Sequence, residues 1–259
     1  MAKVLAITNQ KGGVGKTTTT VNLAASLAAA KKRVLLIDLD PQGNATMGSA
    51  IDKASLAITV YEVLIGTKSV REARIYSEAG KYDILPANRE LAGAEIELVD
   101  IDNRETRLKA ALDVVQDDYD FILIDCPPAL NLLTLNGLCA AKSVMIPMQC
   151  EYYALEGLSD LVNTIRKVRS NLNVDLEIEG LLRTMYDPRN SLAQQVSDQL
   201  LKHFGDKVYR TVIPRNVRLA EAPSFGLPAL YHDRESRGTQ AYLALAGELM
   251  NNAAVAELI

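Results

Sequence analysis

Apolar residues along the chain fall into short aliphatic and β-branched runs, which alternate with longer segments of helical period. The short runs predict strands at 4–7, 34–37, 82–85, 121–124, 144–146, 178–183 and 208–213. The longer segments predict helices at 17–30, 104–116, 130–140, 155–170, 191–204 and 239–251. Strands that alternate with helices in this way indicate repeated βαβ units and a mostly parallel sheet.

The predicted strands are apolar throughout rather than at every second position, as at 34–37. Such runs are typical of strands that are covered on both faces. We therefore expect an α/β fold in which a twisted, mostly parallel sheet lies between two layers of helices. No Pro/Gly/Ser-rich or charge-dense linker interrupts the pattern, so residues 1–259 are expected to form a single domain.

A glycine-rich turn joins the first predicted strand to the first predicted helix. Its residues are Lys11, Gly12, Gly13, Val14, Gly15, Lys16, Thr17 and Thr18. Glycines let successive backbone N–H groups point at phosphate oxygens, and the following helix presents its positive N-terminal end to them. In such a loop Lys16 reaches the β- and γ-phosphates of a nucleotide, and the Thr17 hydroxyl binds Mg²⁺.

A glycine-rich turn can also be a simple tight turn or a dinucleotide-binding turn. A G-x-G-x-x-G register that starts at Gly13 places Thr18 where the third glycine belongs, and this disfavours a dinucleotide. Asp38, at the end of the second strand, could imitate the acid that binds a ribose. The Gly-Lys-Thr triplet at 15–17 nevertheless matches a loop for a nucleoside triphosphate, and we expect ATP as the ligand.

Carboxylates follow two of the predicted strands. Asp38 and Asp40 end the second strand, and Asp125 ends the strand at 121–124. In an open parallel sheet these strand ends meet at the ligand-binding edge. With Thr17 these oxygens are the candidate Mg²⁺ ligands, and Asp40 can orient an attacking water. A single carboxylate such as Asp125 could instead only cap the next helix.

The glycine-rich loop departs from the usual phosphate loop, because Gln10 stands where the first glycine belongs and Lys11 follows it. This K-G-G-x-G-K-[ST]-[ST] pattern resembles the deviant loop of the ParA/MinD family of P-loop ATPases, and the segments around Asp40 and Asp125 follow in the family's order. The resemblance implies a three-layer P-loop NTPase fold. It also implies catalytic roles for Lys16, for Asp40 in hydrolysis, and for Lys11, which would reach the partner's phosphates in an ATP-sandwich homodimer. Lys11 could otherwise be an ordinary solvated lysine.

Two C-terminal segments, 182–187 and 213–216, resemble the family segments that contact adenine. Pro214 and Asn216 are the candidate adenine contacts, although both could belong to structural turns. Cys126, Cys139 and Cys150 form no C-x-x-C pair, so we expect buried, reduced thiols rather than a metal cluster.

Missing features narrow the resemblance within the family. Positions 251–259 hold no Lys or Arg to meet anionic lipid, and no run approaches the roughly 18 apolar residues of a membrane span. No export signal or helix-turn-helix segment is expected ahead of Lys3. The chain therefore resembles the short chromosomal Soj-type ParA proteins, including the segment 221–226, and a cytoplasmic location is expected.

The resemblance implies that the ATP dimer binds double-stranded DNA without sequence preference, in association with the nucleoid, and that a ParB-type partner stimulates slow ATP hydrolysis. A net charge of −4 argues against a uniformly basic protein, so any DNA contact needs a local patch. The candidate residues are Arg189, Lys202, Arg215, Arg218 and Arg234. Each could be an ordinary surface charge. A metabolic enzyme built on the same loop, such as a dethiobiotin-synthetase-like carboxylase, is the alternative function.

Overall fold

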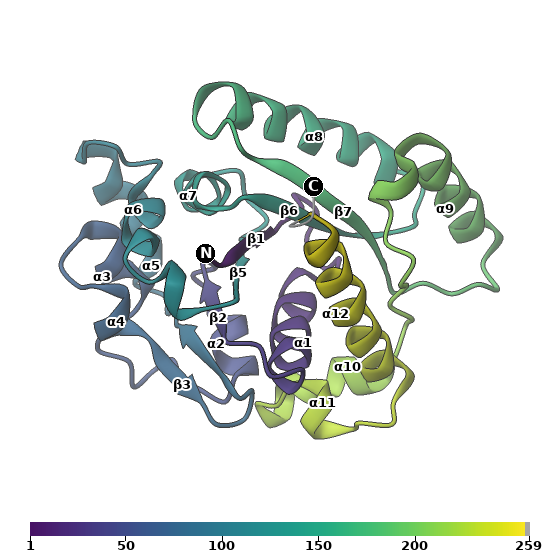
Figure 1. The fold of residues 1–259 in the computed structure, drawn as a ribbon, viewed down its shortest axis with the longest axis horizontal. Coiled ribbons are helices and arrows are strands. Elements are labelled where there is room, and N and C mark those ends of the chain that lie inside the picture. Colours follow the sequence, from purple (N-terminus) through teal and green to yellow (C-terminus); the bar gives the residue numbers. More distant parts are fainter. Residues whose placement is uncertain (257–259) are drawn as a thin grey trace.

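Seven strands form one sheet in this computed structural model, which describes residues 1–256 (Figure 1). In sheet order they are β3 (Ile75–Ser77), β4 (Tyr82–Leu85), β2 (Val34–Asp38), β5 (Phe121–Asp125), β1 (Lys3–Ile7), β6 (Ser143–Gln149) and β7 (Glu177–Thr184). All neighbours pair in parallel except β3, which is antiparallel to β4. The predicted three-layer α/β fold is confirmed. The last three positions of the C-terminal segment 251–259 lie outside the described residues.

Helices cover both faces of the sheet (Figure 1). The longer ones are α1 (Lys16–Ala29), α7 (Leu132–Ala140), α8 (Ala154–Asn171), α9 (Ser191–Phe204) and α12 (Arg237–Ala256). Shorter ones are α2 (Asn44–Gly48), α3 (Val60–Ile65), α4 (Val70–Ala73), α5 (Leu91–Glu97), α6 (Arg107–Asp113), α10 (Val217–Glu221) and α11 (Ala229–His232). Turns of 3₁₀ helix lie at η1 (Leu98–Asp100), η2 (Gln116–Asp118), η3 (Gly205–Lys207) and η4 (Ala222–Phe225). No helix within residues 1–256 is long and apolar enough to cross a membrane.

Successive side chains of each central strand enter opposite cores. In β2, Leu35 and Ile37 belong to the core under α7 and α8, whereas Val34 and Leu36 belong to the core under α1 and α12. All four are buried. A period of two with both faces buried requires an apolar residue at every position, which is why the sequence shows continuous runs.

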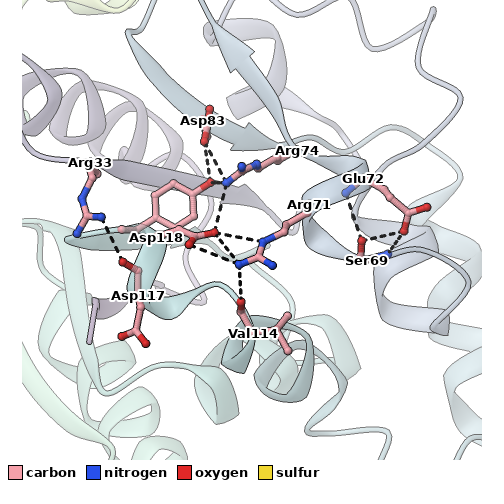
Figure 2. A network of polar contacts seen from close by, with 10 residues as sticks. Arg33, Ser69, Arg71, Glu72, Arg74, Asp83, Val114, Asp117 and Asp118 are labelled. Atoms are coloured by element: carbon pink, nitrogen blue, oxygen red, sulfur yellow. Dashed lines mark hydrogen bonds and ion pairs between the residues drawn. The ribbon is translucent and has the colours of Figure 1, made fainter.

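Ion pairs brace the N-terminal ends of the strands, at the edge opposite the glycine-rich loop (Figure 2). Arg71 binds Asp118 at 3.2 Å, and Arg74 lies 3.6 Å from Asp83 and 3.8 Å from Asp118. Tyr119 donates to Asp83 at 2.7 Å, and its ring lies 5.7 Å from the Arg74 guanidinium. The same residues line an open hollow of about 700 Å³. Because arginines and carboxylates are matched there, this network fastens the β3–β4 hairpin to β5.

The strand predicted at 208–213 is wrong. An isolated bridge at Val208 joins this segment to β7, but regular pairing does not follow. Instead, the Glu248 carboxylate on α12 accepts the backbone N–H groups of Arg210 and Thr211 at 2.7 and 2.9 Å. A side chain far along the chain thus takes the place of a neighbouring strand.

The segment between β2 and β5 holds elements that the apolar pattern did not predict, namely β3 and the helices α2 to α5. They are four to seven residues long, apart from the three-residue β3, and too short for a clear period. Two of them carried a readable signal, since Thr59 with Glu62 and Ser69 with Glu72 form capping boxes. The helix predicted at 104–116 is confined to α6 (Arg107–Asp113), and the separate turn η2 follows at Gln116–Asp118.

Candidate nucleotide site

The glycine-rich loop lies where β1 hands over to α1, as predicted. Gly13 and Gly15 have φ of 75° and 89°, a left-handed conformation that favours glycine. A Cβ at Gly12 or Gly13 would have no heavy atom within 4 Å, so one side of the loop is open. The first N–H groups of α1, which have no partner within the helix, therefore face a loop that a phosphate can enter.

Lys16 starts α1 and is only 8% exposed. Its ammonium donates to the carbonyl of Lys11 at 3.2 Å, so the side chain folds back under the loop. Burial lowers the pKa of Lys16, while the nearby Asp125, Cys126 and Asp40 oppose this shift. The amine is thus a desolvated cation placed inside the turn that phosphates would occupy.

Asp125 ends β5 and is completely buried between two threonine hydroxyls of α1. Thr17 donates to its Oδ2 at 2.7 Å, and Thr20 donates to its Oδ1 at 3.0 Å. Because β5 lies between β1 and β2, the carboxylate sits at the centre of the sheet edge. Thr17 and Asp125 are therefore brought together, as the sequence analysis expected for two oxygen ligands of Mg²⁺.

Asp38 ends β2 directly beside Asp125, in register on the neighbouring strand. Its carboxylate accepts the Thr46 hydroxyl at 2.8 Å, the Thr46 N–H at 2.9 Å and the Asp40 N–H at 3.1 Å. Burial raises the pKa of Asp38, and burial followed by the charge of Asp38 raises the pKa of Asp125. Through these contacts Asp38 holds the Asp40 turn and α2, and its role as a Mg²⁺ ligand stays a prediction.

Asp40 lies at the opening of the site and is half-buried. One of its oxygens accepts the Gln42 N–H at 2.9 Å, which leaves the other available. Within residues 1–256, no three His, Cys, Asp or Glu side chains are grouped closely enough to hold a metal by themselves. This donor set of hydroxyl and carboxylate oxygens fits Mg²⁺, which is usually bound by one or two carboxylates together with phosphates and waters.

Lys11 lies on the outer face of the loop, where its side chain is 47% exposed. Its ammonium forms an ion pair with Glu151 at 2.5 Å, just after β6. Tyr152 and Tyr153 follow, and they are 73% and 72% exposed. Lys11 is therefore held away from the Lys16 side of the loop and beside an exposed aromatic pair.

A cavity of about 160 Å³ lies beside the loop, on the side of β7. Gly15 of the loop and Thr18 of α1 line it on one side, and the predicted residues Pro214 and Asn216 line it from the segment after β7. Asn216 also caps α10, because its side-chain oxygen accepts the Leu219 N–H at 3.3 Å. The structure thus brings both candidate adenine contacts to the loop, and their contact with a base stays a prediction.

Sequence reasoning missed residues that position the site, notably Thr46, Glu151 and Thr184. Glu151 follows the end of β6 closely, which was a usable signal at a ligand-binding edge, whereas Thr46 lies within the short helix α2. Thr184 directly follows the strand predicted at 178–183 and lies in the segment 182–187, but its contact with the glycine-rich loop was not predicted. The three cysteines are free and buried, as expected.

Two of the candidate DNA-binding arginines already hold carboxylates. Arg189 binds Asp187 at 2.8 Å, and Arg218 binds Glu221 at 2.8 Å and Asp233 at 3.2 Å. Bonding to Arg189, with a smaller effect from Arg215, lowers the pKa of Asp187 to about 2. These arginines are therefore exposed, but each already forms an ion pair with a carboxylate.

The other three candidates are exposed, and Arg215 among them lies just before α10. Arg234 follows α11, and Lys202 lies in the last turn of α9. Along that helix, Lys202 is roughly 16 Å beyond the first residue, Ser191. Within residues 1–256, neither side chain forms an ion pair. The five candidates do not form one compact cluster.

Comparison with known proteins agrees with this geometry. A family model described as AAA domain matches residues 2–178. The sporulation initiation inhibitor protein Soj of Bacillus subtilis (strain 168) is 57% identical over 252 residues, covering 97% of this chain and 100% of that protein. The chromosome partitioning protein ParA of Myxococcus xanthus (strain DK1622) is 52% identical, covering 96% of this chain and 88% of that protein.

Among solved structures, the cobyrinic acid a,c-diamide synthase from Mycobacterium smegmatis with bound ADP and magnesium has a TM-score of 0.87. It is 38% identical and covers 98% of this chain and 96% of that chain. The resemblance first seen in the loop at 11–18 thus extends over nearly the whole length. This chain belongs to the ParA/Soj family of P-loop ATPases.

Proposed function

We propose that this protein is an ATP-dependent chromosome-partitioning ATPase that binds ATP with Mg²⁺ at the loop 11–18. One observation carries the proposal: a buried lysine and a threonine-bound buried carboxylate converge on an open glycine loop. Relatives named Soj and ParA, at 57% and 52% identity, support the partitioning role.

The residues have separable tasks. The loop N–H groups and Lys16 bind the phosphates, and the cavity beside Pro214 and Asn216 takes the adenine. When bound, Mg²⁺ would neutralise phosphate charge, held by Thr17 with Asp125 near it. Asp40, at the opening, orients the water that attacks the terminal phosphate.

Lys11 acts only in the ATP-bound homodimer, where it serves the site of the partner. In the monomer its ammonium is held by Glu151, so the dimer must exchange this ion pair for a phosphate contact. A pair exposed by about half on each side is worth little, on the order of 1 kcal/mol or less. A phosphate can therefore displace it readily.

The dimer binds double-stranded DNA without sequence preference, through a surface that includes Arg189, Arg215 and Arg218. A ParB-type partner then stimulates the slow hydrolysis, and the monomer leaves the nucleoid. This cycle in the cytoplasm would move or position chromosomal DNA. Support comes from the family and from the exposure of these arginines.

A small-molecule enzyme is the second candidate, because a protein named cobyrinic acid a,c-diamide synthase shares the fold at 38% identity. The higher identity to Soj and ParA favours partitioning. The two functions differ in what raises ATP turnover. DNA with a ParB-type protein does so in the first case, and a small carboxylic acid substrate does so in the second.

The deciding experiment compares Asp40→Ala with wild type by size-exclusion chromatography in ATP and in ADP. We expect the variant to bind ATP, to lose turnover and to accumulate as a dimer in ATP only. Asp206→Ala, which removes an exposed carboxylate from η3, is the matched control and should behave as wild type. A variant that stays monomeric in ATP, or that hydrolyses ATP normally, would contradict the proposal.

A further inference from the structure

Thr184 ends β7 and touches the glycine-rich loop from the far side of the sheet edge. The residue is 2% exposed, and its hydroxyl donates to the carbonyl of Val14 at 2.7 Å. Val14 is itself buried. The bond joins residues 170 positions apart, and it is the contact through which β7 holds the loop.

This bond fixes the direction of a peptide group that the loop needs. The carbonyl of Val14 and the N–H of Gly15 belong to one planar trans peptide, so they point in opposite directions. A carbonyl turned toward Thr184 therefore directs the Gly15 N–H away from Thr184, on the opposite side of the loop backbone. Gly15, which follows this peptide and has a positive φ, offers little resistance of its own to rotation of the group.

The rest of Thr184 is rigid and faces the base cavity. In the β6–β7 ladder Thr184 pairs with Gln149, and the next segment is tied back, since Tyr186 N–H donates to the Ile213 carbonyl at 3.0 Å. The Thr184 methyl lies 3.9 Å from where a Cβ on Gly15 would stand. Thr184 and Gly15 both line the 160 Å³ cavity. One side chain therefore contacts the loop with its hydroxyl and faces the cavity with its methyl.

We propose that Thr184 is a positioning residue: its hydroxyl orients the Val14–Gly15 peptide so that the Gly15 N–H is aimed at phosphate. The inference rests on the proposed function, because it assumes that the loop 11–18 binds phosphates. Thr184 does not itself touch the reacting atoms. It presets the donor, so that less ordering of the glycine loop is required when nucleotide binds.

The test compares Thr184→Val, which keeps the shape and loses the hydroxyl, with Thr184→Ser, which keeps the hydroxyl. Affinities for ADP and for inorganic pyrophosphate are measured with Mg²⁺ by displacement of a fluorescent ADP analogue. Thr184→Val should weaken both ligands by about tenfold, the equivalent of about 1.4 kcal/mol and within the range for a lost buried hydrogen bond. Thr184→Ser should stay within about twofold of wild type, about 0.4 kcal/mol, which is below that range.

Thr239→Val is the matched control, because it also removes a buried hydroxyl that donates to a backbone carbonyl, that of Asp233 at 2.8 Å. Its ligand affinities should equal those of wild type. If the valine variant unfolds, Thr184→Ala replaces it and should be weaker than Thr184→Ser for both ligands.

Two results would overturn the inference. If Thr184→Val weakens ADP but not pyrophosphate, the residue only shapes the base cavity. If Thr184→Ser fails to restore affinity, the hydroxyl is not the cause. Failure of wild type to bind ADP at all would instead overturn the proposed function, so the two failures are distinguishable.

Discussion

Carboxylates at the N-terminal ends of the strands and carboxylates at their C-terminal ends have different partners. We call these two regions the N-terminal edge and the C-terminal edge of the sheet. At the N-terminal ends of the strands, Asp118 and Asp120 pair with arginines, at 3.2 and 2.9 Å (Figure 2 shows the Asp118 network). At the C-terminal ends, Asp38 and Asp125 are fully buried and, within residues 1–256, form no ion pair. Their donors are neutral hydroxyls and backbone N–H groups.

This difference separates a structural network from a site prepared for a ligand. Bonding to Arg33 lowers the pKa of Asp120, whereas burial raises the pKa values of Asp38 and Asp125. Adjacent buried carboxylates that form no ion pair are costly even with Lys16 nearby, and a divalent ion close to them relieves that cost. The N-terminal strand ends are therefore balanced by their own arginines, whereas on the proposed function the C-terminal strand ends are completed by Mg²⁺ and phosphate.

Lys11→Ala should give the largest effect. It should impair the nucleotide site only in the dimer, where Lys11 serves the site of the partner. We expect turnover to fall by about 10³ to 10⁵, the range for cations supplied across an interface, while ATP binding is largely retained. Steady-state phosphate release measures this effect. Mixing Lys11→Ala with Asp40→Ala protein should restore part of the activity, because some mixed dimers contain one intact site. No recovery at any ratio would contradict action across the dimer.

Lys16→Ala removes the buried cation of the loop itself. ATP affinity should fall by about 30-fold to several thousand-fold, since truncating one partner of a buried charge contact costs about 2 to 5 kcal/mol. Calorimetric titration with ATP measures the loss. Lys32→Ala, at the opposite edge, is the control and should bind ATP normally. Wild-type affinity in Lys16→Ala would remove the phosphate site from this loop.

Arg189→Glu with Arg218→Glu tests the DNA surface. The ATP dimer should bind DNA without sequence preference, and the double variant should lose most of that affinity and of its salt dependence, because about two phosphate contacts per subunit are reversed in charge. Fluorescence anisotropy in a salt series measures both. Nucleotide affinity should be unchanged. Equal DNA affinity of the ADP form, or an unaffected double variant, would show that these arginines do not form the DNA surface.

Arg74→Met tests whether the ion-pair network at the N-terminal strand ends contributes to stability but not to ATP binding. The variant keeps an apolar stem but leaves Asp83 and Tyr119 without their guanidinium partner, which is 32% exposed. The free energy of unfolding should fall by about 1 to 2 kcal/mol, measured by urea denaturation. ATP affinity should not change. A variant of normal stability that binds ATP poorly would show that the two edges are not separate in function.

The pH dependence of stability should carry the smallest signal. Since the folded pKa values of Asp38 and Asp125 are raised, the ligand-free protein binds their protons more tightly than the unfolded chain does. Their contribution to stability is therefore lost as pH rises from about 4, the ordinary carboxyl pKa, through the raised values. Asp125→Asn should flatten this dependence and gain on the order of 1 kcal/mol at neutral pH. An unchanged pH profile in the variant would argue against a strained carboxylate pair.

How far the sequence predicts the structure differs between the two sides of the nucleotide site. The phosphate side was predictable because β1, the loop and α1 are contiguous, and the carboxylates end strands of clear apolar pattern. The base side was harder. Its backbone at 210–211 is held by Glu248 and the loop by Thr184, and both contacts join residues far apart in the chain. No local propensity encodes such a contact.

The central claim is that the carboxylates of the C-terminal edge, and not those of the N-terminal edge, serve Mg²⁺ and ATP. Calorimetric ATP titrations with Mg²⁺ and with EDTA test it on wild type, Asp125→Asn and Asp118→Asn. We predict that Mg²⁺ strengthens ATP binding by at least about tenfold, or about 1.4 kcal/mol, in wild type and Asp118→Asn, and by less than about twofold in Asp125→Asn. The same gain from Mg²⁺ in Asp125→Asn as in wild type would contradict the account.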